Sequence, residues 1–283
     1  MKSKQKRNKT SRLTMAQTSD RHRLYQTAVQ DPQSEVPLIA RIYKKLRGRP
    51  PLSLREDFCG TAYLSVQWCK SNSERTAIGV DLCEETLRWG EEHNVRPAGP
   101  SIARRVSLVH GNVLSTRTAP VDLACAFNFS YNCFKSRATL LEYLEAVRRG
   151  LKPDGMLVMD VYGGTEAMDV TEEERDVEGE NFSYVWEQEK FDPITHDMLC
   201  HIHFNFSDGS RLDKAFSYDW RLWTLPELRE LLTEAGFSKI HVFWEVFKQG
   251  DKDSEYLEST GRYKEVSEVE NQESWVSYVF AER

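Results

Sequence analysis

The chain has 283 residues, 40% of them hydrophobic, and its 38 Lys or Arg and 44 Asp or Glu give a formal net charge of −6. This length can bury a substantial core, as one large domain or as one domain with an insertion. No apolar run approaches the roughly 20 residues that cross a bilayer, so we expect no membrane partner. The net charge argues against general nucleic-acid affinity, although a local basic groove remains compatible with it.

The N-terminal residues 1–18 form a polar tail whose first twelve residues carry six Lys or Arg and no acidic residue. We expect a disordered basic arm, and a nuclear location stays open beside a cytoplasmic one. The six cysteines are scattered without a Cys-x-x-Cys pair. Such spacing indicates neither zinc nor disulfides and is typical of a reduced, cytoplasmic protein.

Residues 19–50 predict an N-terminal helical cap, because apolar residues recur at helical spacing and Asp31-Pro32 divides the run into two helices. A strand–helix alternation follows, which is typical of a parallel sheet with right-handed crossovers. The predicted buried strands are 52–56, 76–81, 106–110, 121–128 and 156–162. The predicted helices between them are 61–71, 83–93 and 136–151.

The sequence pattern changes after Gly164. An acidic segment is followed there by aromatic-rich runs in which apolar and polar residues alternate. We expect residues 165–223 to form an antiparallel β insertion that acts as a lid, with a hairpin turn at 207–210. Thr224 and Pro226 then predict the start of a helix. Two last strands are predicted at 239–246 and 274–281, with a polar stretch between them. Residues 51–283 are therefore expected to form one domain.

Two motifs carry the functional signal of the sequence. The stretch Leu54-Arg-Glu-Asp-Phe-Cys-Gly-Thr-Ala62 is followed about twenty residues later by Ala77-Ile-Gly-Val-Asp81, the spacing of one βαβ unit. Such a unit builds a nucleoside pocket: backbone approaches the ligand at the first turn, and a carboxylate binds ribose hydroxyls at the second strand end.

With the run Leu151-Lys-Pro-Asp-Gly-Met-Leu-Val-Met-Asp160, these motifs resemble the class I S-adenosylmethionine-dependent methyltransferases over roughly residues 50–281. The resemblance implies an α/β fold with a doubly wound, mostly parallel seven-stranded sheet whose last strand is antiparallel. It implies S-adenosyl-L-methionine as cofactor. The first turn departs from the family's pattern, because only Gly60 of three glycines remains.

The resemblance also implies a cofactor site. Asp81 is expected to bind the ribose, Leu82 to lie against the adenine, and Asn112 to accept the adenine amino proton. The alternatives are an ordinary βα turn, a helix N-cap for Asp81 and a simple loop asparagine. The full set of expected cofactor residues is Glu56, Cys59, Gly60, Thr61, Asp81, Leu82, Asn112, Val113, Asn128 and Phe129.

Methyl transfer from a sulfonium is an in-line substitution that positioning alone can accelerate, but a protonated amine or a hydroxyl requires a general base. The candidate bases are Asp160, Glu187 and the histidines of the insertion; capping or a salt bridge is the alternative for Asp160. Tyr131 and Phe129 offer ring faces to a cation. His201 and His203 share one strand face without a carboxylate fixed by spacing, so we predict packing and no metal site.

The aromatic insertion favours an amine or an aromatic metabolite as substrate. Methylation of RNA or protein, helped by the basic tail, is the alternative, and nucleic acid is not favoured as a partner. A catalytically silent protein of the same fold is a third reading. An NAD-dependent dehydrogenase fits poorly, because the first turn lacks the G-x-G-x-x-G pattern.

Overall fold

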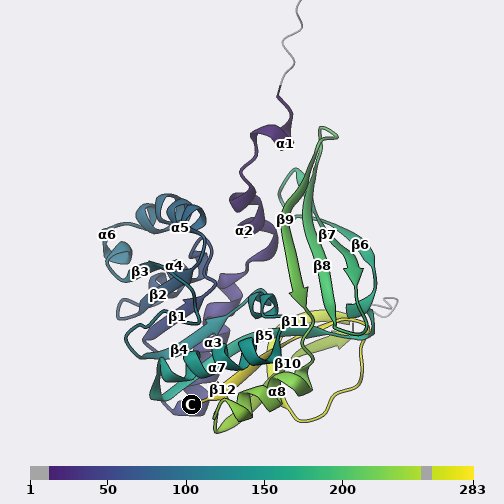
Figure 1. Ribbon diagram of the computed structural model, residues 1–283. Helices are drawn as coiled ribbons and strands as arrows, with labels where there is room; N and C mark the ends of the chain where they lie inside the picture. The colour runs from purple at the N-terminus through teal and green to yellow at the C-terminus, as the bar shows by residue number, and fades with distance from the viewer. Residues whose placement is uncertain (1–12, 250–256) are drawn as a thin grey trace, which may run out of the picture.

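Figure 1 shows the computed structural model of the chain, which describes residues 13–249 and 257–283. Its main sheet contains eight described strands in the order β11-β10-β12-β5-β4-β1-β2-β3. These strands are β1 (Ser53–Asp57), β2 (Thr76–Asp81), β3 (Val106–His110), β4 (Val121–Ala126), β5 (Leu151–Gly163), β10 (Lys239–Gln249), β11 (Leu257–Val266) and β12 (Trp275–Glu282).

Strands β1 to β5 are parallel to one another, and β12 runs antiparallel between β5 and β10. All six residues of β4 are buried, as expected for a central strand with helices on both faces. The predicted α/β fold with an antiparallel last strand is thereby confirmed. The structure adds an eighth strand, β11, which pairs antiparallel with β10 at the sheet edge. The sequence did not predict this strand, because its residues are mostly polar. An edge strand pairs with one neighbour only and does not need an apolar pattern.

Helices cover both faces of this sheet (Figure 1). Those on one face include α3 (Pro32–Arg47), α4 (Tyr63–Lys70) and α6 (Pro100–Ala103), and those on the other are α7 (Arg137–Arg149) and α8 (Leu225–Glu234). The crossover from β2 to β3 also contains α5 (Glu84–Gly90), the π-helical turn η1 (Glu91–Val95) and the short 3-10 helix η2 (Arg96–Ala98). None of the described helices has the length and apolar character needed to cross a membrane.

Helix boundaries follow from capping residues. Asp31 caps α3 through the Ser34 amide, and Gly48 ends it in the left-handed conformation. Thr224 and Glu227 form a capping box at the start of α8, with Pro226 in its first turn as predicted. The short 3-10 helices η3 (Ser130–Cys133) and η4 (Thr165–Met168) follow β4 and β5.

A second, four-stranded antiparallel sheet rises from the carboxyl end of β5 (Figure 1). The predicted insertion supplies all of it, and the acidic segment that precedes the aromatic runs is itself a strand. Its members are β6 (Thr171–Asp176), β7 (Phe182–Phe191), β8 (Asp197–Phe206) and β9 (Arg211–Arg221). Helix α2 (Arg21–Val29) packs Leu24 and Ala28 into the apolar cluster of this sheet.

The predicted tail is shorter than residues 1–18. Residues 1–12 lie outside the described residues, but α1 (Met15–Thr18) is a formed helical turn, closed by a capping box between Thr14 and Gln17. The amide of Met15 donates to Asp208, and that of Ala16 donates to Ser210, in the β8–β9 hairpin turn. Expecting disorder here was wrong, because this contact joins residues more than 190 positions apart and leaves no local signal.

Candidate functional site

The turn after β1 keeps a left-handed backbone without the glycines that usually allow it. Phe58, Gly60 and Ala62 have φ values of 58°, 53° and 56°. A side chain in this conformation costs on the order of 1–2 kcal/mol, so two of these three residues are strained. The amide of Cys59 donates to the Val80 carbonyl at 3.1 Å, which fixes the turn against β2. The structure therefore retains the shape of a ligand-binding turn at an energetic cost.

Asp81 at the end of β2 closes this turn from the other side. Its carboxylate accepts the amides of Gly60 and Cys83, each at 2.8 Å and each on a different oxygen. Every carboxylate oxygen can accept a second hydrogen bond, so the group can still receive two donors from a ligand. Beside it, Leu82 is 68% exposed, which is unusual for a large apolar side chain and leaves an apolar surface next to a carboxylate.

The predicted cofactor residues divide into two groups. Among those turned inward, Cys59 packs beneath Gly79, Thr61 donates its hydroxyl to Gln26, and Val113 lies in the core. Glu56 is also buried. The remaining residues lie at the carboxyl edge of the sheet: Gly60, Asp81, Leu82, Asn112, Asn128 and Phe129.

Glu56 is held under the turn rather than presented to solvent. Its carboxylate accepts both the amide and the hydroxyl of Ser65 in α4. Burial is the main reason that the pKa of Glu56 rises to about 7, and the hydrogen bonds from Ser65 oppose that rise. In this position Glu56 ties the turn to α4.

Asp160 organises the exit from β4. Asn128 and Phe129 adopt φ values of 54° and 55°, and their amides donate to the two oxygens of Asp160 at 2.7 and 3.0 Å. Burial raises the pKa of Asp160 to about 7, although these amides favour the carboxylate. Tyr131 is 1% exposed and donates its hydroxyl to the Asp160 backbone carbonyl, which places this ring in the core. Tyr131 lines neither of the two cavities described below, where its ring was expected to contact a cation.

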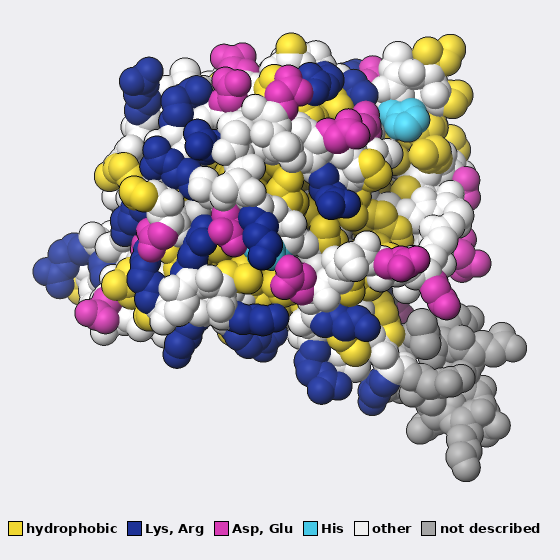
Figure 2. Space-filling model, turned by 90° about the horizontal axis from the view of Figure 1, so that it is seen from below, with side chains coloured by type: hydrophobic (Ala, Val, Ile, Leu, Met, Phe, Trp, Pro, Cys, Tyr) yellow, Lys and Arg dark blue, Asp and Glu magenta, His cyan; other side chains and the backbone are white. Residues whose placement is uncertain are grey.

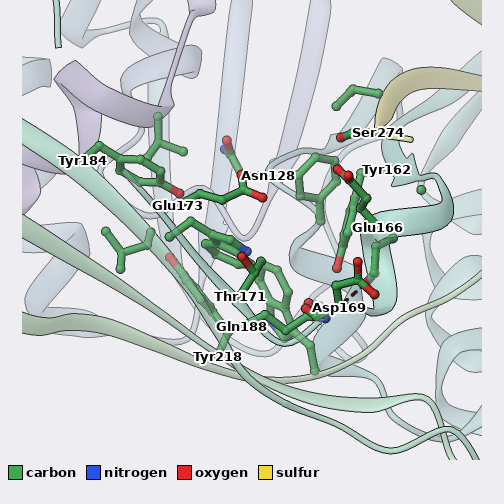
Figure 3. A pocket seen from close by; sticks show the side chains of 18 of the residues that line it. Asn128, Tyr162, Glu166, Asp169, Thr171, Glu173, Tyr184, Gln188, Tyr218 and Ser274 are labelled. Carbon is green, nitrogen blue, oxygen red and sulfur yellow. Dashed lines mark hydrogen bonds between the residues drawn. The ribbon is translucent and has the colours of Figure 1, made fainter. Parts of the chain in front are cut away.

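A cavity of about 350 Å³ lies between the second sheet, α2 and the end of β5. Figure 3 shows Tyr184 and Tyr218 on one side of it and Tyr162 on the other, with Asn128 between them. Phe129 packs on Tyr162 with ring centroids 4.6 Å apart, and Tyr218 packs on Trp220 at 4.4 Å. The polar lining residues are Asn128, Glu166, Asp169, Thr171, Glu173, Gln188 and Ser274.

A second cavity adjoins the first, and both are lined by Val29, Asn128, Phe129 and Val276. Its further walls are acidic and phenolic, and Glu35 of α3 is among them. Sequence reasoning missed Glu35, because it lies in an ordinary amphipathic helix and in no motif. The remaining lining residues are Asp31, Ser34, Glu35, Leu38, Asp160, Glu245, Gly261, Tyr263 and Tyr278.

Helix α2 bridges the two halves of the site. Gln26 accepts the Thr61 hydroxyl at 2.7 Å and the Asn94 amide at 2.7 Å, while Asp20 accepts the Trp89 indole N–H at 2.7 Å. On its other side, α2 packs against the second sheet and contributes Tyr25 to the cavity wall. The helix therefore joins the turn after β1 to the aromatic cavity.

Glu187 lies on the opposite face of the second sheet from the cavity, which is lined by its neighbours Trp186 and Gln188. Its carboxylate binds His203 Nε2 at 2.9 Å. The expected role of Glu187 as a base is incompatible with this face, since successive strand residues point to opposite sides.

The histidines of the insertion do have carboxylate partners, contrary to expectation. His201 binds Glu189, and the carboxylates around both histidines come close enough to hold a cation. Lys214, however, donates to Glu189 and lies 3.1 Å from His201 Nε2, so a protein ammonium group already supplies positive charge there. The spacing concealed these pairs because they form diagonally between strands.

No protein-family model matches the chain. Over 183 residues it is 25% identical to a Bacillus subtilis protein named "Putative methyltransferase YqeM", covering 63% of this chain and 70% of that protein. An S-adenosylmethionine-dependent methyltransferase from Clostridium acetobutylicum superposes with a TM-score of 0.65 at 17% identity, over 92% of this chain and 96% of the other.

Two further solved structures share the fold. CalS10, an amino pentose methyltransferase from Micromonospora echinaspora, gives a TM-score of 0.62 at 15% identity, over 93% of this chain and 95% of its own. The sugar N-methyltransferase KedS8 from Streptoalloteichus also gives 0.62, at 16% identity and over 99% of both chains. These superpositions extend over more than nine-tenths of this chain, so the fold is shared over nearly its whole length.

Proposed function

We propose that this chain, which has the class I methyltransferase fold, is an S-adenosylmethionine-dependent methyltransferase that methylates nitrogen or oxygen of a small molecule. The observation that carries the proposal is the carboxyl edge of the sheet. There, a strained left-handed turn, Asp81 and the exposed Leu82 lie at the same sheet edge as Asn128 and Phe129, which follow the neighbouring strand β4 and line the cavity. The fold is that of the relatives, but the assignment of chemistry rests on this constellation.

The residues at this edge fit the cofactor. Asp81 retains free acceptor positions for ribose hydroxyls, and Leu82 offers an apolar surface to a purine. Asn112 stands at the end of β3, where its side chain already accepts the Leu114 amide. The inward-facing residues act by shaping the turn after β1; they are Glu56, Cys59, Thr61 and Val113.

When bound, S-adenosylmethionine supplies a methyl group on a positively charged sulfur. The residues of this chain hold the acceptor in line with that group and exclude water. Asn128 and Phe129 line both cavities and follow β4, which pairs with β1, so they connect the acceptor cavities to the sheet edge proposed to hold the donor. Their fixed backbone, bound to Asp160, positions one half against the other.

The form of the cavity favours a small acceptor over a macromolecule. Helix α2 and the second sheet enclose it, and the described lining residues include carboxylates without any Lys or Arg. Such walls repel a phosphate backbone, and an RNA acceptor therefore fits poorly. Two of the fold neighbours are named for amino-sugar or sugar nitrogen chemistry, which favours nitrogen as the accepting atom.

Calorimetric titration with S-adenosylmethionine and S-adenosylhomocysteine tests the proposal. We expect micromolar binding by the wild type and a loss of at least 100-fold in Asp81→Ala, because this variant removes both ribose acceptors. Glu92→Ala, an exposed carboxylate in η1, is the matched control and should bind normally. Failure of the folded wild type to bind either ligand would refute the function and leave only the fold.

A further inference from the structure

The two adjoining cavities share an acidic lining. Three carboxyl side chains line the aromatic cavity and four line the second cavity, while their described walls contain no Lys, Arg or His. Figure 2 shows a contrasting face, over which Lys and Arg are widely spread with fewer Asp and Glu among them. The seven carboxyl groups are Glu166, Asp169 and Glu173, then Asp31, Glu35, Asp160 and Glu245.

Glu35 combines two properties that separate it from the other carboxyl groups: unlike Glu166, Asp169 and Glu173 it is partly buried, and it also lacks a compensating partner. No described residue forms a hydrogen bond or an ion pair with its carboxylate. Burial raises the pKa of Glu35 to about 8, and the nearby carboxyl groups of Asp160, Asp31 and Glu56 add to the rise. By contrast, both oxygens of Asp160 are engaged by amides.

Glu35 is partly buried, and withdrawing a carboxylate from water without a partner is costly. Glu35 lies in the first turn of α3, at a wall that shares Asn128 and Phe129 with the aromatic cavity. The missing partner is therefore a cation that enters from the cavity. Aromatic faces on the same path, such as those of Phe129 and Tyr162, favour an ammonium group over a hydrated metal ion.

We propose that the acceptor is a primary or secondary amine, bound as its ammonium form, and that Glu35 takes its proton before methyl transfer. This inference rests on the proposed function and names the substrate class of the same site. A hydroxyl acceptor brings no charge to satisfy the cavity, so the acidic walls offer it no comparable attraction.

The steps balance in atoms and charge. The ammonium group gives one proton to the Glu35 carboxylate, which becomes a neutral carboxylic acid, and the amine regains its lone pair. That lone pair forms the new N–CH₃ bond as the S–CH₃ bond breaks, and the bonding electrons of the latter return to sulfur. The products are a methylated ammonium and a neutral sulfide, and Glu35 releases its proton to solvent. A base with a pKa near the working pH suits both proton transfers.

The first test compares two probes of similar shape, benzylamine and benzyl alcohol, by calorimetry with and without saturating S-adenosylhomocysteine. We expect the wild type to bind the amine at least tenfold more tightly than the alcohol. Glu35→Gln should lose at least tenfold in amine affinity while its affinities for the alcohol and for S-adenosylhomocysteine stay within twofold. Glu230→Gln, an exposed carboxylate on α8, should behave as the wild type.

Equal affinities for the two probes, no binding of benzylamine, or an unchanged amine affinity in Glu35→Gln would each overturn the proposal. A failure of S-adenosylhomocysteine to bind, with amine binding intact, would instead contradict the proposed function. The two failures are thus distinguishable in one set of titrations.

The second test uses benzyltrimethylammonium, a cation that does not titrate. Its affinity for the wild type should rise with pH through about 8, as Glu35 ionises, and this inflection should vanish in Glu35→Gln. An inflection near 7 from Asp160 should remain in both proteins. A wild-type profile without the inflection near 8 would contradict the role of Glu35. The other titratable groups facing this cavity or coupled to Glu35 are Asp31, Glu56, Glu245, Tyr263 and Tyr278.

Discussion

The proposed donor edge, formed by Gly60, Asp81 and Leu82, and the proposed acceptor cavity, lined by Asn128 and Phe129, lie at the same edge of the sheet but are built in different ways. The donor edge comes from successive βα turns between residues 58 and 129, and backbone amides around Asp81 define it. The acceptor cavity gathers side chains from residue 25 to residue 278, and aromatic rings and carboxyl groups define it. A ligand that is the same in different proteins of one fold can be bound by backbone shape. A ligand that differs between them is selected by side chains on distant elements.

Asp160→Ala should have the largest effect, because Asp160 supports both regions. Its removal leaves the amides of Asn128 and Phe129 without their acceptors, which costs about 2–4 kcal/mol of unfolding free energy. Urea denaturation measures this loss, and titration should show weaker binding of both S-adenosylhomocysteine and benzylamine. Asp160→Asn keeps one acceptor, and its loss of unfolding free energy should be about half of that in Asp160→Ala. An effect on only one ligand would show that the regions are independent.

Glu56→Gln should alter the donor side alone, through pH. Since the pKa of Glu56 is raised from 4.5 to about 7, its contribution to stability is complete below about pH 4.5 and is lost as pH rises through 7. Gln still accepts the Ser65 donors and carries no charge. The variant should therefore match the wild type at pH 5 and exceed it at pH 8, by on the order of 3 kcal/mol.

Thermal unfolding at the two pH values measures this difference, and Glu92→Gln serves as the exposed control. Equal differences at pH 5 and pH 8 would contradict the assignment. Benzylamine affinity should stay within twofold of the wild type at pH 5.

Trp186→Leu should give the smallest effect and confine it to the acceptor side. Trp186 lines the aromatic cavity about 6.2 Å from both Tyr218 and Trp220, measured between ring centroids. Leucine keeps apolar volume but loses the ring face, so benzylamine affinity should fall roughly tenfold, within the range of a cation–π contact. Calorimetry should find benzyl alcohol and S-adenosylhomocysteine unaffected. A parallel loss of alcohol binding would identify Trp186 as an apolar wall only.

The donor half was accessible from sequence because its signals are local. Asp81 follows a short buried strand at the spacing of a βαβ unit, and the family resemblance added Leu82 and Asn112. Local signals could not show which side chains turn inward. The direction of Thr61 depends on Gln26, 35 positions away, and Val113 packs against core residues from several helices.

The acceptor half required the tertiary structure. Glu35 reads as one polar residue of an amphipathic helix, and only the approach of α3 to β5 and β12 places it beside Asp160 and Tyr278. Glu187 shows the opposite error: it looked chemically suitable, but the strand period directs it away from the cavity. Strand β11 escaped notice because an exposed edge strand does not need an apolar pattern.

The bridging position of α2 has a consequence for how the chain assembles. Residues 20–29 are synthesised nearly 200 positions before residue 221, where the strands against which α1 and α2 rest come to an end. Contacts of such long sequence separation form slowly, because a large loop must close first. The parallel core can form before this segment docks, and we expect the cavity wall that includes α2 to be completed last.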